Sequence, residues 1–308
     1  MRVLLLPLLF ASCITPQVVE GKRVPDQPNI LFVVIDDLGW TDFGCQGSGY
    51  YETPNIDRLA AEGIRFTDAY SCGPNCSPSR AALLTGNYPT RTGVTTVLNK
   101  KVYEFALKEH PRRKSLAASE TTFAEVLGDS GYATISLGKW HLGKEKDGED
   151  PLGQGFDENV GGTHQGHPAS YHHPFGKEGV RVPIEAPEGS YLTDVITDHA
   201  LDFIRRNQDG PFCVYLPYYA VHTPIQPRAD LKAKYDAKEP VGGHKNAGYA
   251  AMIDAVDEGV GRLLALLDEL ELTEETLVVV TSDNGGHSVT SNLPLRGRKG
   301  MLYEGGIR

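Results

Sequence analysis

The fold of this 308-residue chain is decided by the stretch NILFVVI at residues 29–35, which Asp36 and Asp37 follow directly. The stretch is apolar after its first residue and rich in β-branched side chains, a pattern typical of a strand buried on both faces of a parallel sheet. Shorter runs of the same kind predict three more strands, at residues 132–137, 212–216 and 277–281. Together these runs indicate a central sheet.

Helical patterns lie between the predicted strands. Thr53 and Pro54 predict the start of a helix, as capping residue and first-turn proline, and Gly63 predicts its end. Apolar residues at helical spacing predict two further helices, at residues 192–204 and 249–267. Helices that alternate with buried strands predict an α/β fold, in which helices flank a mainly parallel central sheet.

Two stretches between these elements predict long loops, because residues 143–190 and 223–246 are rich in glycine, proline and polar residues. Loops of this length within a compact domain usually serve a function. Residues 161–173 carry clustered histidines with tyrosine and glutamine, which suit hydrogen bonds to sugar hydroxyls. A polar surface loop is the alternative interpretation of the same residues.

The net charge and the N-terminal residues indicate an exported protein. A net charge of −10 argues against a binder of nucleic acid or of membrane surfaces. Residues 1–13 predict an export signal, because Arg2 precedes an apolar run that is too short to span a bilayer. Plain secretion and a lipid anchor at Cys13 are both compatible with it, so we expect a periplasmic, extracellular or outer-membrane protein. Residues 14–28 read as a linker.

The cysteines allow one disulfide in such an oxidising compartment. Four of them lie beyond the predicted signal: Cys45, Cys72, Cys76 and Cys213. The sequence alone does not pair them.

A second informative stretch is CSPSR at residues 76–80. The apolar residues after it and the stop at Gly86 predict a short helix, with Pro78 tolerated in the first turn. Cys76 then lies at the positive end of the helix dipole, and Arg80 shares its face. A nucleophilic sulfur beside a guanidinium suits a tetrahedral oxyanion such as sulfate or phosphate. A buried thiol beside an unrelated arginine is the alternative.

Charged and polar side chains follow each of the predicted strands. Lys139 and His141, two residues apart, would point to the same side of an extended backbone. In open α/β sheets, ligands bind outside the carboxyl ends of the strands. We therefore expect one site there, built from Asp36, Asp37, Lys139, His141, His222, Asp283 and Asn284.

The acidic members of this set predict a metal ion. Two like charges about 4 Å apart repel by about 4 kcal/mol at an effective dielectric constant near 20. A cation would relieve the repulsion between Asp36, Asp37 and Asp283, and raised carboxylate pKa values would be the other escape. Together with Asn284, these residues offer only oxygen atoms as metal ligands, which favours Ca²⁺ or Mg²⁺ over zinc. Turns or helix caps are the alternative interpretation of the Asp36-Asp37 and Asp283-Asn284 pairs.

Several stretches resemble motifs of the sulfatase family, the formylglycine-dependent, arylsulfatase-like enzymes of the alkaline phosphatase superfamily. CSPSR resembles the family's cysteine-x-proline-serine-arginine motif, and GYATISLGKWH at residues 131–141 resembles its second motif. Two shorter matches are VHTP at residues 221–224, and GRKG at residues 297–300 ahead of YEGG at residues 303–306. The resemblance implies that residues 29–308 form the N-terminal catalytic domain of such an enzyme, with the C-terminal part missing from this chain.

The resemblance also implies a reaction. A maturation enzyme would oxidise Cys76 to formylglycine, whose hydrate attacks the sulfur of a sulfated carbohydrate or aryl sulfate. His222 would protonate the leaving alcohol, and His141 would support the release of sulfate. One Ca²⁺ ion is implied at Asp36, Asp37, Asp283, Asn284 and the converted Cys76. The sulfuryl oxygens would be neutralised by Arg80, Lys139 and Lys299.

Two other functions are compatible with the sequence. A phosphodiester or phosphonate ester hydrolase of the same superfamily would share the CSPSR run, although related two-metal phosphatases need further Asp and His ligands. A non-catalytic binder of sulfated glycans is the other alternative. The filled catalytic positions argue against this second possibility.

Overall fold

The computed structural model describes residues 26–98, 112–177 and 182–308, so the predicted export signal, Cys13 and most of the predicted linker lie outside the described residues. The described part contains a parallel five-stranded sheet in the order β3-β2-β4-β1-β5. Its strands are β1 (Asn29–Ile35), β2 (Ala133–Leu137), β3 (Glu158–Val160), β4 (Phe212–Pro217) and β5 (Thr276–Ser282). The predicted parallel α/β fold is confirmed.

β1 packs against a hydrophobic core on each face, as its continuous apolar run predicts. Leu31, Val33 and Ile35 join the larger core, whereas Val34 faces the second core together with the partly buried Phe32. This alternation follows the two-residue period of a strand. β4 and β5 pair with β1 on either side, so the stretch quoted first forms an interior strand, next to the edge strand β5.

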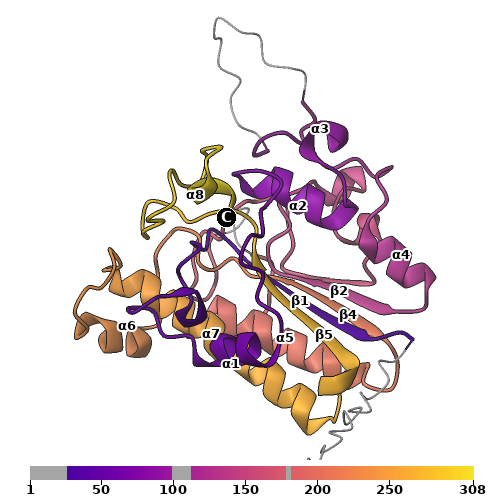
Figure 1. Ribbon diagram of the computed structural model, residues 1–308. Coiled ribbons are helices and arrows are strands. Elements are labelled where there is room, and N and C mark those ends of the chain that lie inside the picture. The colour runs from indigo at the N-terminus through magenta and orange to yellow at the C-terminus, as the bar shows by residue number, and fades with distance from the viewer. Residues whose placement is uncertain (1–25, 99–111, 178–181) are drawn as a thin grey trace, which may run out of the picture.

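Helices cover both faces of the sheet (Figure 1). On one face α7 (Ala247–Glu269) packs against α1 (Pro54–Glu62) and α5 (Leu192–Arg206). On the other face lie α2 (Cys76–Thr85) and α4 (Phe123–Asp129), which contribute to the second core. The shorter helices are α3 (Pro89–Thr92), α6 (Ala229–Asp236) and α8 (Glu304–Ile307), with 3-10 turns η1 (Gly44–Gln46), η2 (Glu145–Asp147), η3 (Leu152–Gln154) and η4 (Thr273–Glu275).

The two predicted long loops contain regular structure that the sequence pattern did not reveal. β3 lies within the first and pairs with β2 in parallel register. α6 lies within the second and packs on α7. β3 is an edge strand whose residues are all half-buried. It therefore lacks the continuous apolar run by which buried strands are recognised.

α1 starts where predicted, with Thr53 at the N-cap position and Pro54 in the first turn, but the Thr53 side chain does not cap the helix. Thr53 makes no side-chain hydrogen bond to the first N–H groups of the helix. Its hydroxyl donates instead to Asp57 Oδ1 at 2.9 Å. Asp257 of α7 accepts from the backbone N–H groups of Asn55 at 3.2 Å and Ile56 at 2.8 Å. A carboxylate from a distant helix thus takes the place of the local cap.

The cysteines of the described residues are all free, so the disulfide that the sequence allows is not formed among them. Cys72 is exposed and Cys45 is half-buried, whereas Cys76 and Cys213 are buried. Burial raises the pKa of Cys213 to about 12. Cys213 therefore remains a protonated core thiol at neutral pH.

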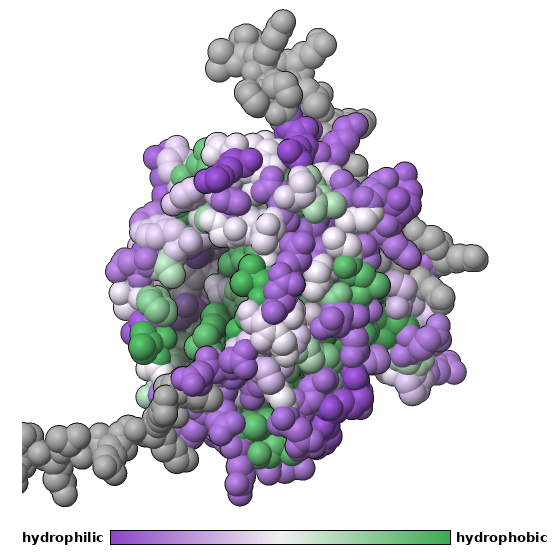
Figure 2. Space-filling view, turned by 90° about the vertical axis from the view of Figure 1, so that its right-hand side faces the viewer, coloured by the Kyte–Doolittle hydropathy of each residue, from purple (hydrophilic) through white to green (hydrophobic). Residues whose placement is uncertain are grey.

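The surface is mostly hydrophilic, with apolar patches. Figure 2 shows such patches on one face, several of them around a hollow on the left of the view. The most exposed large apolar side chains are Ile64, Leu302 and Phe66. Within the described residues, no helix combines the length and apolar character needed to span a bilayer.

Candidate active site

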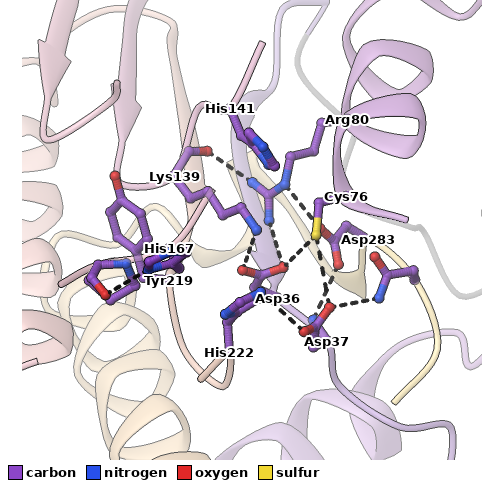
Figure 3. A network of polar contacts seen from close by, with 12 residues as sticks. Asp36, Asp37, Cys76, Arg80, Lys139, His141, His167, Tyr219, His222 and Asp283 are labelled. Carbon is purple, nitrogen blue, oxygen red and sulfur yellow. Dashed lines mark hydrogen bonds and ion pairs between the residues drawn. The ribbon is translucent and has the colours of Figure 1, made fainter. Parts of the chain in front are cut away.

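The side chains that follow the strands meet above the carboxyl ends of the sheet, as predicted (Figure 3). Asp36 and Asp37 follow β1, Lys139 follows β2, and Asp283 follows β5. The structure brings together all of the predicted site residues: Asp36, Asp37, Cys76, Arg80, Lys139, His141, His222, Asp283, Asn284 and Lys299. The geometry alone leaves their individual roles as predictions.

Cys76 is the first residue of α2, at the helix start that the sequence predicts. Its side chain is buried, and Sγ lies 3.5 Å from Asp36 Oδ1 and 3.9 Å from Asp37 Oδ1. Burial and the carboxylate of Asp36 raise the pKa of the thiol above its ordinary value. The unmodified side chain is therefore a protonated thiol at neutral pH, and a thiol is a much weaker nucleophile than a thiolate.

Arg80 lies one turn after Cys76, and its guanidinium is fully buried. Nε donates to Asp283 Oδ2 at 2.9 Å, and Nη1 donates to the backbone oxygen of Lys139 at 2.9 Å. Nη2 makes no hydrogen bond among the described residues, but it lies 3.6 Å from Asp36 Oδ1 in an ion pair. Because a buried donor without a partner is costly, Nη2 is a candidate contact for an anionic ligand.

Lys139 and His141 reach the site, but not through the extended backbone predicted. β2 ends at Leu137, and the backbone then turns at Gly138 with φ 111° and at His141 with φ 61°. A Cβ at Gly138 would lie 2.4 Å from the backbone oxygen of Pro217, so only glycine fits there. His141 is held by a hydrogen bond from its N–H to the Thr163 oxygen at 2.9 Å. The loop after β2 therefore places each side chain separately.

The two lysines each bind one carboxylate of the loop after β1. Lys139 Nζ lies 2.5 Å from Asp36 Oδ2, and Lys299 Nζ lies 2.6 Å from Asp37 Oδ2. Lys139 is fully buried. Burial opposes the charge of Lys299, but Cys76 and Asp37 together raise its pKa above the ordinary value. Lys299 therefore carries a positive charge beside Asp37, and Lys139 is ion-paired with Asp36.

His222 presents one nitrogen to the site. Its Nδ1 lies 2.7 Å from the backbone oxygen of Thr223. A carbonyl oxygen only accepts hydrogen bonds, so Nδ1 carries the hydrogen. Nε2 lies on the other side of the ring, 3.5 Å from Asp37 Oδ2. Burial lowers the pKa of His222, although Asp36 opposes this effect. Nε2 is thus the atom that can exchange a proton with a ligand.

The acidic residues fit a divalent cation. Asp36, Asp37 and Asp283 each place a carboxylate oxygen within 4.8 Å of the others. Asn284 donates from Nδ2 to Asp37 Oδ1 at 2.9 Å, and its Oδ1 is buried without a partner among the described residues. This set of oxygens suits a hard cation such as Ca²⁺. The other group of potential ligands in the described chain also contains Asp36, so it does not form a separate second cluster.

The carboxylates and the permanent cations of the site are balanced in number. Burial and the nearby Asp36 raise the pKa of Asp283. Burial also favours the neutral form of Asp36, but Lys139, His222 and Arg80 together outweigh it and lower the pKa of that carboxyl. Neutralising the carboxylates with a divalent cation would leave the lysines available to an anion. The same pocket can therefore hold a cation and an oxyanion side by side.

Asp42 supports the site, and sequence reasoning missed it. It is fully buried and accepts from the Gly39 N–H at 2.8 Å, the Tyr249 hydroxyl at 2.6 Å and the Thr290 hydroxyl at 2.7 Å. These bonds tie the loop after β1 to α7 and to the loop after β5. Tyr249 and Thr290 lie more than 200 positions away along the chain. No local pattern could have identified them as partners.

Part of the stretch 161–173 reaches the site, as predicted for a pocket wall. The rings of His167 and His222 are stacked, with centroids 5.9 Å apart. Gly166 packs on His141, because a Cβ there would lie 2.4 Å from the Cε1 atom of that ring. His172 packs on Tyr191 instead, with centroids 5.3 Å apart. Gly166 and His167 therefore contact site residues, and Tyr171 donates from its hydroxyl to the His222 backbone oxygen at 2.8 Å.

Comparisons with known proteins point to one family. The family model described as Sulfatase matches residues 28–308. The chain is 34% identical over 371 residues to a sulfatase of Formosa agariphila, covering 98% of this chain and 66% of that protein. It is 35% identical over 308 residues to N-acetylgalactosamine-6-sulfatase of Homo sapiens, covering 94% of this chain and 57% of that protein.

A solved structure gives the same result. Ps i-CgsB in complex with k-i-k-neocarrahexaose matches with a TM-score of 0.77 at 34% identity, covering 92% of this chain and 64% of that one. The chain thus spans 57% to 66% of the length of these three proteins.

Proposed function

The chain belongs to the sulfatase family, and from this premise we propose that it hydrolyses sulfate esters of sulfated carbohydrates. The observation that carries the proposal is the pair of unsatisfied buried atoms beside Cys76. Among the described residues, Arg80 Nη2 donates no hydrogen bond, although it lies 3.6 Å from Asp36 Oδ1, and Asn284 Oδ1 accepts none. An oxyanion would satisfy the first atom and a cation the second. A sulfate ester bound beside Ca²⁺ supplies both.

Cys76 provides the nucleophile in this proposal. Its conversion to formylglycine by a maturation enzyme would supply a hydrated aldehyde that attacks the sulfur. Arg80 orients the side chain from one turn further along α2, where its Nε and Nη1 are fixed by two hydrogen bonds. Lys139 and Lys299 place positive charge near the sulfuryl oxygens. Such preorganised charges stabilise a transition state without reorganisation.

The metal-binding residues act together with these cations. One Ca²⁺ ion would supply positive charge at the oxygens of formylglycine and sulfate. Asp36, Asp37, Asp283 and Asn284 would hold it, and Asp42 would keep the loop after β1 in place through its three hydrogen bonds.

The two histidines have opposite tasks. His222 holds a hydrogen on Nδ1 against Thr223, so Nε2 is the atom that would take up a proton and pass it to the leaving alcohol. His141 is suited to accept a hydrogen bond from the hydrate, because burial and Lys139 lower its pKa well below the ordinary value and keep the ring neutral. Its Nδ1 is buried and has no partner among the described residues. It would support deprotonation of the second hydroxyl of the hydrate, which precedes the release of sulfate.

The first test removes the nucleophile. Cys76→Ala should abolish the release of sulfate from 4-nitrophenyl sulfate and from sulfated sugars, while circular dichroism and the melting temperature stay close to those of the parent. Mass spectrometry of the parent's Cys76 peptide should detect replacement of the thiol by a carbonyl. Full activity of the alanine variant would refute the assignment.

The second test removes the metal. Treatment with EGTA should abolish activity, and added Ca²⁺ should restore it. Ca²⁺ should also raise the melting temperature, because a ligand that binds only the folded state stabilises it. Asp283→Asn should weaken this thermal shift. Turnover by the metal-free protein would contradict the role of the ion.

A phosphodiester or phosphonate ester hydrolase is the nearest rival function. The donor set around Asp36 favours a single metal ion and thus the sulfatase reaction. Parallel assays with 4-nitrophenyl sulfate and bis(4-nitrophenyl) phosphate separate the two activities. A non-catalytic glycan binder would bind sulfated sugars and release sulfate from none of them.

Substrate and location complete the proposal. The names of two relatives, an N-acetylgalactosamine-6-sulfatase and a complex with neocarrahexaose, favour a sulfated sugar. A screen of defined sulfated sugars would identify it. Export, with or without a lipid anchor at Cys13, is supported by the apolar run that follows Arg2. Fractionation of cells that express the full chain would test it.

A further inference from the structure

His167 is a polar side chain at the mouth of the site that no step of the proposed reaction uses. We propose that it contacts the sugar that carries the scissile sulfate and thereby selects the substrate. This inference rests on the proposed function and adds to it the residue that recognises the sugar.

The first support is the position of the ring. The His167 and His222 rings are nearly parallel, at 11°, with centroids 5.9 Å apart (Figure 3). The side chain of His222 is only 15% exposed, whereas His167 is an exposed residue. His167 therefore forms the outer layer of the pocket, directly above the predicted general acid.

The second support is the hydrogen-bonding state of the ring. Nδ1 of His167 lies 3.1 Å from the backbone oxygen of Pro168. Because a carbonyl oxygen can only accept, Nδ1 carries the hydrogen, and Nε2 of the neutral ring is an acceptor. Nε2 has no partner among the residues that the structure describes. An acceptor is thus presented to any ligand that fills the mouth.

The third support is that the segment carrying His167 contacts the loop after β2, which carries His141, at two points. The neighbouring Gly166 lies directly against the ring of His141, and the Thr163 oxygen accepts the N–H of His141 at 2.9 Å. These contacts set the distance between this segment and the reacting atoms. His167 is therefore positioned for recognition, as a specificity residue requires.

The chemistry of the substrate follows from this geometry. If His222 Nε2 protonates the leaving oxygen, the carbon that bears this oxygen and its neighbours extend toward the mouth. A hydroxyl next to the sulfate ester would then donate to Nε2 of His167. A sugar has such a hydroxyl, whereas a simple aryl sulfate has none. Sites that bind a hydroxyl in this way discriminate strongly against analogues that lack it.

The test measures a ratio of specificities in the full chain. His167→Ala removes the ring, and His167→Phe keeps aromatic packing on His222 but removes the acceptor. His172→Ala is the matched control, because His172 belongs to the same stretch but packs on Tyr191. For each variant, kcat/KM is measured on the best sulfated sugar and on 4-nitrophenyl sulfate. If the parent does not hydrolyse 4-nitrophenyl sulfate, the reference substrate is the deoxy analogue of the sulfated sugar, which lacks the hydroxyl next to the sulfate ester.

Both His167 variants should lower the ratio of sugar to reference kcat/KM by about 10- to 100-fold, whereas the control should keep it. Equal losses on both substrates would overturn the inference, because they would mean that His167 only supports His222. Full retention of the ratio by His167→Phe would overturn it as well. Absence of sulfate release by the parent would refute the proposed function itself, and is distinguishable from both results.

Discussion

Replacing Arg80 by lysine would show whether the site needs the guanidinium or only its positive charge. The guanidinium fills a fully buried position and donates from Nε to Asp283 and from Nη1 to the backbone oxygen of Lys139, both at 2.9 Å. Lysine keeps the charge but has a single nitrogen at the end of a flexible stem. It cannot replace both bonds and also offer the donor that Nη2 presents.

Two losses follow from this geometry. A hydrogen bond to a charged group contributes about 1.5–3 kcal/mol, so losing one should lower the free energy of unfolding by about 2 kcal/mol. Loss of a positioned donor in the transition state costs about 3–4 kcal/mol, which corresponds to a decrease in kcat of about 10²–10³-fold. Arg80→Ala should be less stable than Arg80→Lys, because it leaves the buried Asp283 without its cation.

The assay measures sulfate release together with urea denaturation of the same preparations. Arg91→Lys is the control, because Arg91 is exposed and should change neither property. If Arg80→Lys retained kcat within about fivefold of the parent, the charge alone would suffice, and the geometric reasoning would be wrong.

Three further predictions concern packing and burial. Asp257→Ala removes the carboxylate that binds the start of α1, so urea denaturation should show a free energy of unfolding lower by about 2 kcal/mol; an unchanged value would refute this capping role. Gly166→Ala should lower kcat by at least about tenfold, because its Cβ would lie 2.4 Å from the His141 ring, whereas Gly210→Ala has nothing within 4 Å and should have no effect. Equal kcat values for the two alanine variants would argue against this contact. Burial raises the pKa of Cys213 to about 12, so its thiol should become reactive only as the pH approaches that value. At a pH near 8, iodoacetamide should therefore label the exposed Cys72 in the native protein and leave the buried Cys213 unlabelled. Equal labelling of both peptides by mass spectrometry would show that Cys213 is accessible.

Much of the site could be predicted from the sequence because parallel strands deliver their last residues to one edge of the sheet. Once NILFVVI was assigned to a buried strand, the places of Asp36 and Asp37 followed. Cys76 and Arg80 lie one helical turn apart, so the short helix alone places them on one face. The family resemblance added Lys299, whose motif carries no local structural signal.

Other predictions failed where the decisive contact is distant along the chain. Thr53 has the chemistry of a helix cap, yet Asp257 of another helix binds the free N–H groups. The turn at Gly138 and His141 replaces the expected extended backbone, because the loop packs against Pro217 and Thr163. In both cases local preference was overridden by packing.

The sequence by itself determined the buried strands, the helix that starts at Cys76 and the chemical composition of the site, because periodicity and side-chain chemistry act between neighbours along the chain. Tertiary structure decided which lysine binds which carboxylate, and that His167 lies against His222. Such choices depend on distance and burial, since the attraction between charges grows as they approach and as water is excluded. Only the folded chain sets those two quantities.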